Sequence, residues 1–316
     1  MLNRRILRMK VFKVLYSSVV SGDMSVPSAV TQLKESCEAT RNLYVYMCGM
    51  VVPLTKLAKE RVIDLQNKIN PTEEERNPNM KFCDNRLADV LADSPDFEKV
   101  FKKLKCSWES YDLYLRRLLD VVYTRDYYKQ YMSSGLSSVE EDCELFVKIF
   151  EEEIVDSQGI DEILEDGSIY WNDDLAYALT QCCRMFREIG KGSHWYLPEL
   201  YQSSILAKNG KTVEDDSLFA MKLLQSGFTH YGEYSQMVSD TASNWERERM
   251  YAGDIVLVAL ALSEIVTFPT IPVKVSMNEY VEISKYYCTP KSSVFVNGIL
   301  DKLVKQLRDS GAIDKQ

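Results

Sequence analysis

The fold of this chain is decided by three runs near the end of the sequence: NWERERMYAGDIVL (244–257), FPTIPVKVSMNEYVEISKYY (268–287) and KSSVFVNGILDKLVKQL (291–307). A stretch that begins at Arg249 or Asp254 is nearly all apolar as far as Thr267. A helix that is apolar all round is buried, so we expect this one at the centre of a core. Pro269 and Pro272 follow it, and proline does not continue a helix.

Two further helices are expected in the second and third runs. Ser276 and Glu279 have the spacing of a capping box, which predicts a helix from Met277 to Tyr287. The last helix is expected from about Val294 to Arg308, with Gly311 beyond its end. The end of the chain is therefore predicted to be a group of short-linked helices.

The rest of the chain also has helical patterns. Residues 3–20 show apolar residues at helical spacing, and a second helical stretch runs from Pro27 towards Ile69. The polar segment 72–85 is expected to be a loop, and aromatic-rich amphipathic segments occupy residues 85–201. Another helix is expected from Asp216 to about Asn244. With only 13 glycines and 9 prolines, the composition favours an all-α fold.

Charge is unevenly distributed along the chain. The formal net charge is −9 and the pI is near 5.0, which alone disfavours nucleic-acid binding, because phosphate binding relies on clustered Lys and Arg. Residues 1–22 nevertheless hold five basic residues and no acidic one: Arg4, Arg5, Arg8, Lys10 and Lys13. Acids concentrate in the middle, as from Glu140 to Asp156. A basic end on an acidic chain indicates a localised binding site.

The eight cysteines form no Cys-x-x-Cys pair, and only two histidines accompany them. These spacings assemble no zinc site, and we expect neither a metal nor a cofactor. Thiols scattered through apolar helical stretches are typical of reduced cysteines in a cytosolic protein. The charged N-terminus lacks a signal-peptide cleavage site. The most apolar run, Ile255 to Leu262, is far shorter than the roughly 20 residues of a membrane span, so we expect a cytoplasmic protein.

The end of the chain carries an ordered set of signals: Trp245-x3-Arg249-x4-Asp254, an apolar helix, Pro-x-Lys-Val at 272–275, Asn278-Glu279 and FVNGILDK at 295–302. Their order and spacing resemble the C-terminal half of the NusB family of bacterial transcription antitermination factors. Residues 1–16 resemble the same family's arginine-rich first helix, with its Leu-Tyr pair at Leu15 and Tyr16. The resemblance implies an all-α, NusB-like helical bundle with a large helical insertion in the middle.

The resemblance also implies a domain organisation. Residues 1–22 would form the N-terminal basic helix of the NusB-like core, and 216–310 would form its C-terminal helical part. Between them, 23–215 would be a helical expansion of unknown role, similar to the expanded middle of Bacteroidetes-type members. Residues 311–316 would be a tail. The family's function cannot be projected onto the expansion.

The first helix carries most of the candidate RNA-binding residues. Arg4, Arg5 and Arg8 fall at the family's spacing and lie within about a 100° arc of an ideal helix. With Lys10 they are expected to hold an RNA backbone, because the guanidinium group matches phosphate oxygens and stacks on bases. Tyr16 is expected to stack on an unpaired base, an interaction worth about 1–3 kcal/mol. The alternative is a helix with a solvated basic end and a core tyrosine.

The resemblance implies two more RNA contacts. Asp254 would accept a hydrogen bond from a base amino group, and Phe295 would flank the RNA. The alternatives are a charge at a helix N-terminus for Asp254 and a core aromatic for Phe295. Gly298 inside a helix costs about 1 kcal/mol relative to alanine, which indicates a close helix crossing. Trp245 is most simply a core residue.

The chain departs from the family pattern at four positions. Ile6 and Ile255 stand where many members have a basic residue, Ala259 stands where they have arginine, and Met9 stands where many have glutamate. These changes predict an RNA affinity that is weaker, or differently distributed, than in the short members.

The resemblance implies an RNA-binding transcription antitermination factor. It would bind boxA-type single-stranded RNA together with the NusE-type ribosomal protein, in an RNA polymerase antitermination complex; a homodimer over the basic helix stays open. The alternative is a protein–protein scaffold on the same fold that has lost RNA binding and uses its acidic middle as the partner surface. No catalytic constellation is found, since Ile189 to Ser193 lacks the residues of a phosphate loop, and we expect no enzyme activity.

Overall fold

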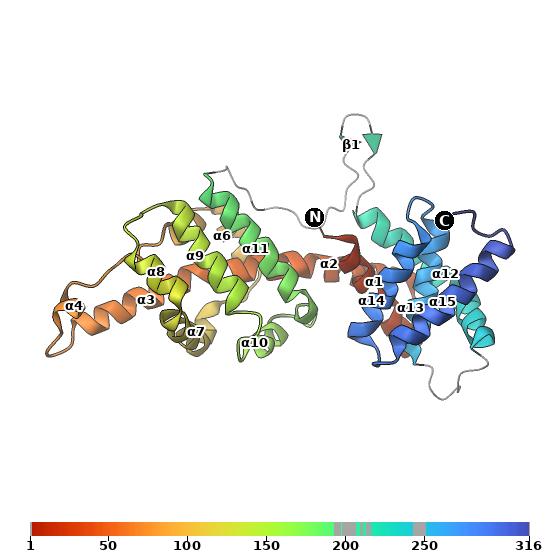
Figure 1. The fold of residues 1–316 in the computed structure, drawn as a ribbon, viewed down its shortest axis with the longest axis horizontal. Coiled ribbons are helices and arrows are strands. Elements are labelled where there is room, and N and C mark those ends of the chain that lie inside the picture. Colours follow the sequence, from red (N-terminus) through yellow and green to blue (C-terminus); the bar gives the residue numbers. More distant parts are fainter. Residues whose placement is uncertain are drawn as a thin grey trace. The chain divides into compact units, whose positions relative to one another are not determined.

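The computed structural model describes residues 2–192, 197, 207–208, 211–212, 216–242 and 251–315. The chain divides into two compact units (Figure 1). Unit 1 comprises Met1–Cys37 and Leu200–Gln316, and unit 2 comprises Glu38–Glu199. Unit 1 is therefore built from the two ends of the sequence, whereas unit 2 is one continuous segment. Residues 23–37, assigned above to the expansion, fall in unit 1.

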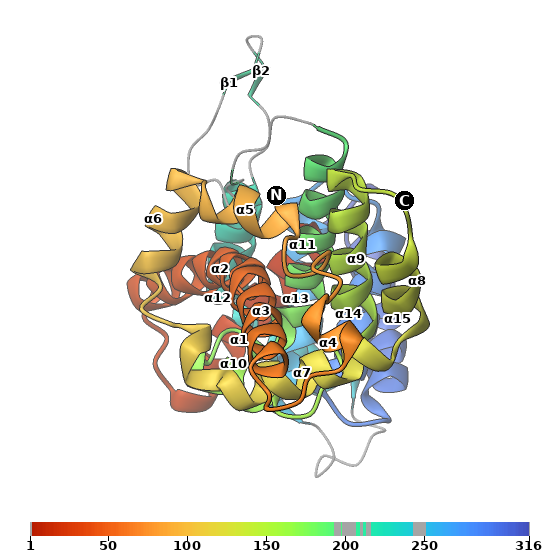
Figure 2. The same cartoon turned by 90° about the vertical axis from the view of Figure 1, so that its left-hand side faces the viewer.

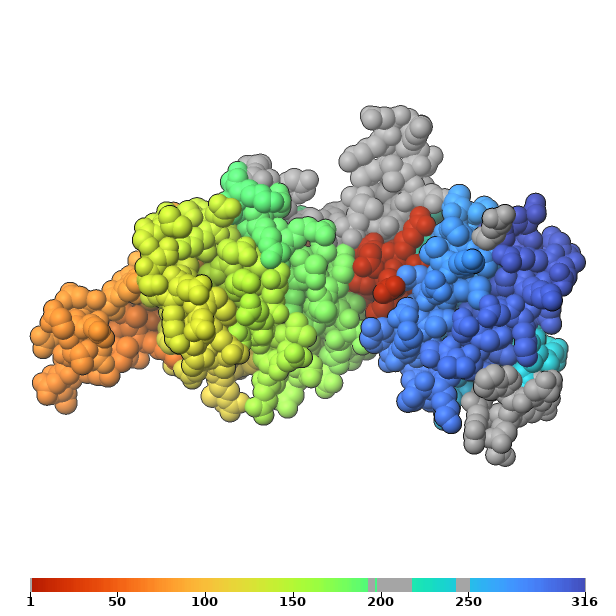
Figure 3. All heavy atoms as spheres, viewed as in Figure 1, coloured from red at the N-terminus to blue at the C-terminus, as the bar shows by residue number. Residues whose placement is uncertain are grey.

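The described elements of unit 1 are α1 (Arg4–Ser21), the first part of α2 (Val26–Cys48), the antiparallel pair β1 (Ala207–Lys208) and β2 (Lys211–Thr212), α12 (Asp216–Thr241), α13 (Ala252–Thr267), α14 (Val273–Tyr287) and α15 (Ser292–Asp309). The cores of both units are helical, which confirms the predicted all-α class. In Figure 3 the red N-terminal residues lie against the blue C-terminal helices of this unit.

Helix α1 has clear end signals. The side chain of Asn3 accepts a hydrogen bond from the backbone N–H of Ile6 and caps the first turn. Gly22 ends the helix with a φ of 75°, a left-handed conformation that glycine adopts without steric penalty. Its apolar residues, such as Leu7 and Leu15, are fully buried. The predicted first helix is confirmed to within one residue at each end.

Helix α13 is the centre of unit 1, as predicted. It packs against α1, α12, α14 and α15, and every residue from Val256 to Ile265 is buried. Burial of each large aliphatic side chain stabilises the fold by about 1.5–3 kcal/mol relative to leaving it in water. An apolar helix is therefore stable here without a polar face.

Two predictions about the last helices are wrong. Helix α14 begins directly after Pro272, not at a capping box, because Ser276 is buried inside the helix and Glu279 pairs with Arg5. A Cβ added at Gly298 would meet no described atom of another helix within 4 Å, so this glycine marks no close crossing. Gly311 does follow the end of α15, with a φ of 74°.

Three residues of the C-terminal signature lie outside the described residues: Asn244, Trp245 and Arg249. Within the described part of the chain, no helix is long and apolar enough to span a membrane. The same part contains no group of His, Cys, Asp or Glu that could hold a metal ion.

The described elements of unit 2 are the second part of α2, α3 (Val51–Gln66), α4 (Glu73–Arg76), α5 (Arg86–Ala92), α6 (Pro95–Lys103), the 3-10 turn η1 (Trp108–Tyr111), α7 (Asp112–Thr124), α8 (Asp126–Ser133), α9 (Val139–Glu152), α10 (Ile160–Gly167), the 3-10 turn η2 (Asn172–Asp174) and α11 (Leu175–Gly190). Helices α9 and α11 lie side by side (Figure 1), and the rings of Phe150 and Phe186 pack edge to face between them.

The stretch predicted to run as one helix from Pro27 towards Ile69 is interrupted. Helix α2 ends at Cys48 and α3 starts at Val51, with Gly49 between them. A Cβ on Gly49 would lie 2.1 Å from Cε2 of Phe101, so the ring of α6 occupies the space that any other side chain would fill. The segment predicted to be a polar loop, 72–85, contains the single turn α4.

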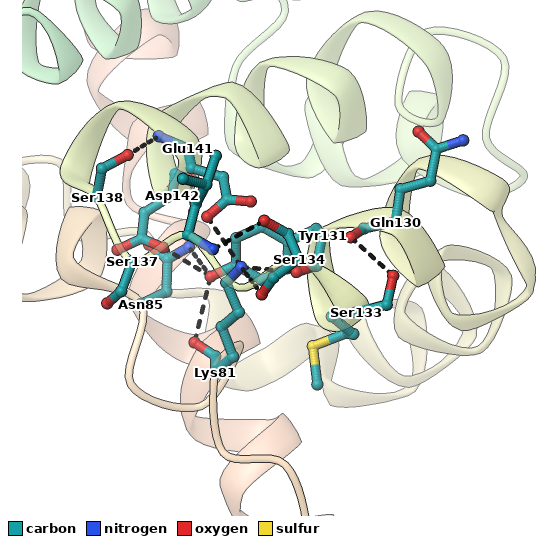
Figure 4. Close-up of polar contacts among 12 residues, drawn as sticks. Lys81, Asn85, Gln130, Tyr131, Ser133, Ser134, Ser137, Ser138, Glu141 and Asp142 are labelled. Carbon is teal, nitrogen blue, oxygen red and sulfur yellow. Dashed lines mark hydrogen bonds and ion pairs between the residues drawn. The ribbon is translucent and has the colours of Figure 1, made fainter.

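A polar network fastens the segment before α5 to α8 and α9 (Figure 4). The hydroxyl of Tyr131 donates to Oδ1 of Asp142 at 2.7 Å, and the amide of Asn85 donates to the backbone oxygen of Asp142 at 3.2 Å. Lys81 donates to the backbone oxygen of Tyr131 at 2.7 Å and pairs with Glu141 at 2.8 Å. These groups satisfy one another, so we interpret the network as structural.

Charge separates between the two units. Unit 2 contains 20 Lys and Arg and 31 Asp and Glu, a formal charge of −11. Unit 1 contains the remaining 18 basic and 16 acidic residues, a formal charge of +2. The acidity of the whole chain therefore belongs to unit 2.

Candidate nucleic-acid interface

Arg8 of α1 is directed into the core of unit 1. Its side chain is 4% exposed and forms a bidentate ion pair with Glu264 of α13, with Nε and Nη2 each 2.7 Å from a carboxylate oxygen. Two parallel charge-assisted hydrogen bonds of this kind are among the strongest polar contacts in proteins. The guanidinium group of Arg8 therefore holds α1 against α13.

Glu264 has two further donors on α14. The hydroxyl of Ser276 donates to Oε1 at 2.7 Å, and the hydroxyl of Tyr280 donates to Oε2 at 3.1 Å. Tyr280 is fully buried, which raises the pKa of its phenol, and the neighbouring Glu264 carboxylate raises it further. Each carboxylate oxygen accepts two hydrogen bonds, so this buried charge is fully compensated.

Glu279 of α14 joins the same network from the surface side. Arg5 donates to its two oxygens at 2.9 and 2.8 Å, and Nη1 of Arg8 lies 3.6 Å from Oε2. The hydrogen bond from Arg5 lowers the pKa of Glu279. The side chain of Arg5 is still about half exposed, so this pair can exchange partners more readily than the Arg8 pair.

The other two predicted cations at this end of α1 also contact protein groups. The guanidinium carbon of Arg4 lies 5.1 Å from the ring centroid of Phe219 on α12, a cation–π distance. Lys10 is buried, and its ammonium donates to the backbone oxygen of Ser36 at 2.8 Å. Arg4 and Arg5 lie near the surface, whereas Arg8 and Lys10 are buried.

The other end of α1 has an aromatic cluster. The ring centroid of Phe12 lies 5.8 Å from that of Tyr16 and 5.7 Å from that of Tyr287. The ammonium of Lys13 lies 5.1 Å from the centroid of Tyr287. Tyr16 is 39% exposed. A flat aromatic face beside a cation is the combination that binds unpaired bases and the adjoining phosphates.

Asp254 lies next to this cluster, at the start of α13. A Cβ built on the preceding residue, Gly253, would be 3.8 Å from the ring of Tyr16 and 3.2 Å from Sγ of Cys288. Asp254 itself is 2% exposed, and among the residues that the structure describes its Oδ1 has no hydrogen-bond partner. Burial raises its pKa, against hydrogen bonds from Ser292 and Cys288 that lower it. The same environment raises the pKa of Cys288 to about 12.

Phe295 is placed near Asp254 through α15. Ser292, which hydrogen-bonds with Asp254, is the first residue of that helix, and Phe295 follows one turn later. Phe295 is only 6% exposed. Tyr16, Asp254 and the start of α15, which carries Phe295, therefore lie at one end of unit 1, with the tyrosine ring as the exposed member.

The arginines lie at a distance from this end. Helix α1 runs antiparallel to α13, because Arg8 pairs with Glu264 near the C-terminal end of α13 while Tyr16 lies beside Gly253 at its start. Glu264 and Asp254 are separated by about 15 Å along a helix that rises 1.5 Å per residue. The predicted site residues thus form two groups on unit 1, which are joined by α1.

Three residues of the aromatic end were absent from the predicted site. Lys13 was counted only as part of the basic segment, while Tyr286 and Tyr287 had no predicted role. Tyr286 lies in the last turn of α14 and is 79% exposed, a high fraction for a tyrosine. The sequence signal that could have indicated these residues is the pair of adjacent tyrosines at the end of α14.

Comparison with known proteins assigns the chain to a family. The NusB family model matches residues 191–305 of the chain. A transcription antitermination protein NusB from Desulfatibacillum aliphaticivorans is 30% identical over 125 residues, which are 38% of this chain and 87% of that protein. The chain belongs to the NusB family. The resemblance inferred from the sequence is thereby confirmed.

Other NusB proteins are similar over a smaller share of their length. The protein from Salinibacter ruber is 37% identical over 97 residues, 31% of this chain and 61% of that protein. The one from Chloroherpeton thalassium is 33% identical over 128 residues, 40% of this chain and 56% of that protein. The chain thus spans about three fifths of the length of these two relatives. No solved structure matches the chain.

The NusB family match covers part of unit 1 and almost none of unit 2. It starts at residue 191, so nearly all of unit 2 lies outside it. The relatives carry the name of an antitermination protein, not of an enzyme. What the family does is therefore relevant to unit 1 and leaves unit 2 unexplained.

Proposed function

We propose that this protein is a transcription antitermination factor that binds boxA-type single-stranded RNA with the NusE-type ribosomal protein, in an RNA polymerase antitermination complex. The observation that carries the proposal is the aromatic end of unit 1, where the exposed ring of Tyr16 lies against Phe12 and near Gly253, and where Lys13 and Tyr287 complete the cluster. Such a factor acts where RNA polymerase transcribes, which places it in the cytoplasm, and the role needs no enzyme activity.

The proposal gives each end of α1 a different task. At the aromatic end, Tyr16 stacks on a base and Lys13 meets a phosphate, while Asp254 accepts a hydrogen bond through its unpaired Oδ1. Because Asp254 and Phe295 are nearly closed off from solvent, an RNA contact to either residue requires neighbouring groups to move.

At the other end, Arg4 and Arg5 supply surface charge for the RNA backbone. Arg8 and Lys10, which the sequence placed in the same phosphate-binding set, instead position α1 through Glu264 and Ser36. The proposal also keeps the NusB-like core and the helical expansion as separate functional parts, in unit 1 and unit 2 respectively.

The decisive experiment measures binding of a boxA-type RNA by fluorescence anisotropy, with and without the NusE-type protein. Tyr16→Ala should weaken binding by about 1–3 kcal/mol, the usual loss for a base-stacking ring. Tyr231→Ala, which removes a half-buried tyrosine of α12, is the matched control and should bind like the wild type. Lys13→Ala should reduce the slope of affinity against salt by about one charge.

A second function remains in competition, because unit 2 carries a formal charge of −11. In that case the protein is a scaffold that binds other proteins and not RNA. If wild type and Tyr16→Ala bind the RNA equally poorly even with the NusE-type protein present, the RNA-binding proposal fails and the scaffold takes its place.

A further inference from the structure

Unit 2 contains an open cavity of about 430 Å³ between α3, α5, α6 and η1. Its apolar lining comes from Val52, Pro53, Leu91, Phe97, Phe101 and Trp108. Packing voids in protein cores hold little more than a water molecule, whereas pockets for ligands and partner side chains span about 300–1,000 Å³. This volume is that of a binding pocket. Figure 2 shows α6 beside α5 on this unit.

The walls of the cavity are held in place before any partner arrives. The indole N–H of Trp108 donates to the backbone oxygen of Tyr46 at 2.8 Å, and its ring stacks on that of Tyr46 at 4.5 Å. On the other side, Phe101 fills the space left by Gly49 and stacks on Phe97 at 5.9 Å. A pocket with fixed walls binds without first ordering its own side chains, which favours affinity.

Charged groups surround the apolar lining. Glu98, Glu109 and Lys56 contribute to it, and Glu98 already pairs with Lys102. Glu109 is exposed and has no ion pair with any residue that the structure describes. It therefore offers a carboxylate to a cation that arrives next to an apolar group.

The charge of unit 2 decides between classes of partner. A formal charge of −11 repels nucleic acid and draws basic proteins into encounter. We propose that this cavity is a docking site for a basic protein segment, which inserts an apolar anchor side chain between Trp108 and Phe97 and pairs a Lys or Arg with Glu109. The NusB family match does not include the residues of this cavity, so the proposed docking site belongs to unit 2 and not to the NusB-like core.

The probe is an amphipathic helical peptide of leucine and lysine, titrated into the full chain by isothermal titration calorimetry. We expect binding of one peptide per chain. Two analogues test the two parts of the proposal: glutamate in place of every lysine, and alanine in place of every leucine. Each analogue should bind at least about tenfold more weakly, a difference of roughly 1.4 kcal/mol. If the acidic analogue binds as tightly as the basic one, the proposal is overturned.

Two matched pairs of variants locate the site. Val52→Trp places a large ring in the cavity and should weaken binding at least about tenfold, as loss of an anchor pocket does. Ile63→Trp makes the same change on the exposed part of α3 and should leave it unchanged. Glu109→Lys should weaken binding about fivefold, against no change for Glu162→Lys on α10.

Equal binding to Val52→Trp and Ile63→Trp would show that the peptide merely adheres to an acidic surface, and would overturn the site. Helical content by circular dichroism shows whether Val52→Trp is folded. If it is not, the Glu109 pair decides the question, because that residue is on the surface. The RNA affinity of all four variants should equal that of the wild type, so this test and the RNA-binding test fail separately.

Discussion

Unit 1 and unit 2 are each stabilised internally, by different kinds of contact. In unit 1 a buried ion pair joins Arg8 to Glu264, residues 256 positions apart. In unit 2 stacked rings do the corresponding work: Tyr46 packs between Trp108 and Trp171, with ring centroids 4.5 and 5.1 Å away. The basic helix that suggests a ligand site thus uses part of its charge internally, while the acidic unit packs an aromatic cluster in its core. A cluster of cations in a sequence therefore does not by itself locate a binding surface.

The largest effect should come from breaking the ion pair of unit 1. Glu264→Ala leaves the guanidinium of Arg8 buried with only its longer contact to Glu279, and loss of a buried partner costs about 3–5 kcal/mol of unfolding free energy. Urea denaturation followed by circular dichroism measures this loss. The double variant Arg8→Met, Glu264→Leu should recover part of it, because a buried pair can be replaced by apolar groups, but the buried hydroxyls of Ser276 and Tyr280 still lose their acceptor. Wild-type stability for Glu264→Ala would show that Arg8 is not held as described.

The second largest effect on stability is expected from Gly49→Ala in unit 2. Gly49→Ala sets a Cβ about 2.1 Å from the Phe101 ring, so either the ring or α6 must move. Such overpacking typically costs about 1–3 kcal/mol. The loss should appear in the denaturation of unit 2 while RNA binding is retained. A loss of RNA affinity with no change in stability would contradict this assignment.

Gly298→Ala is the matched glycine substitution in unit 1 and should have the opposite sign. Its added Cβ meets no described atom of another helix within 4 Å, and α15 is a helix at this position. Alanine in a helix interior is favoured over glycine by up to about 1 kcal/mol. Thermal denaturation should therefore show a small gain, and a loss would reveal a contact that the structure lacks.

The smallest effect concerns pH. Burial raises the pKa of Asp254, so its stabilising contribution is complete below the pKa of an unfolded aspartate and is lost as the pH rises through the folded-state pKa. Asp254→Asn should therefore raise the stability of unit 1 at neutral pH and leave it little changed in acid. Stability measured from pH 3 to pH 8, a range of about five units around the usual carboxylate pKa values, checks the trend.

The contribution of Glu279 to stability should depend on pH in the opposite direction to that of Asp254. Its pKa is lowered by Arg5, so its contribution is present above the pKa of an unfolded glutamate and is lost as the pH falls. Glu279→Gln should therefore cost stability at neutral pH, and the difference from wild type should shrink in acid. Identical pH profiles for the two variants would show that the environments of these carboxyl groups have been misassigned.

Much of the fold could be predicted from local patterns. The apolar run that forms α13 indicated a central helix, and Gly311 marked the end of α15. The close approach of the Phe101 ring to Gly49 could not be predicted, because the two residues are distant in sequence. The capping box at Ser276 failed for the same reason, since Glu264 on another helix accepts the hydrogen bond of that serine.

The candidate site was predictable only in part. The sequence placed Arg4, Arg5 and Arg8 on one face of a helix, but which of them is buried depends on a carboxylate in the last quarter of the chain. Tyr16 was identified from its family position, and its exposure adds support. Lys13 acquires its place only through contact with Tyr287, so no spacing within α1 could indicate it.

The Arg8–Glu264 pair also sets an order of events during synthesis. A ribosome that adds about 5–20 residues per second produces Glu264 roughly 13–50 seconds after Arg8. Throughout that interval the continuous segment that forms unit 2 emerges in full, while the first helix waits for its partner. We expect nascent chains released before α13 to contain a folded middle and an unprotected, chaperone-binding first helix.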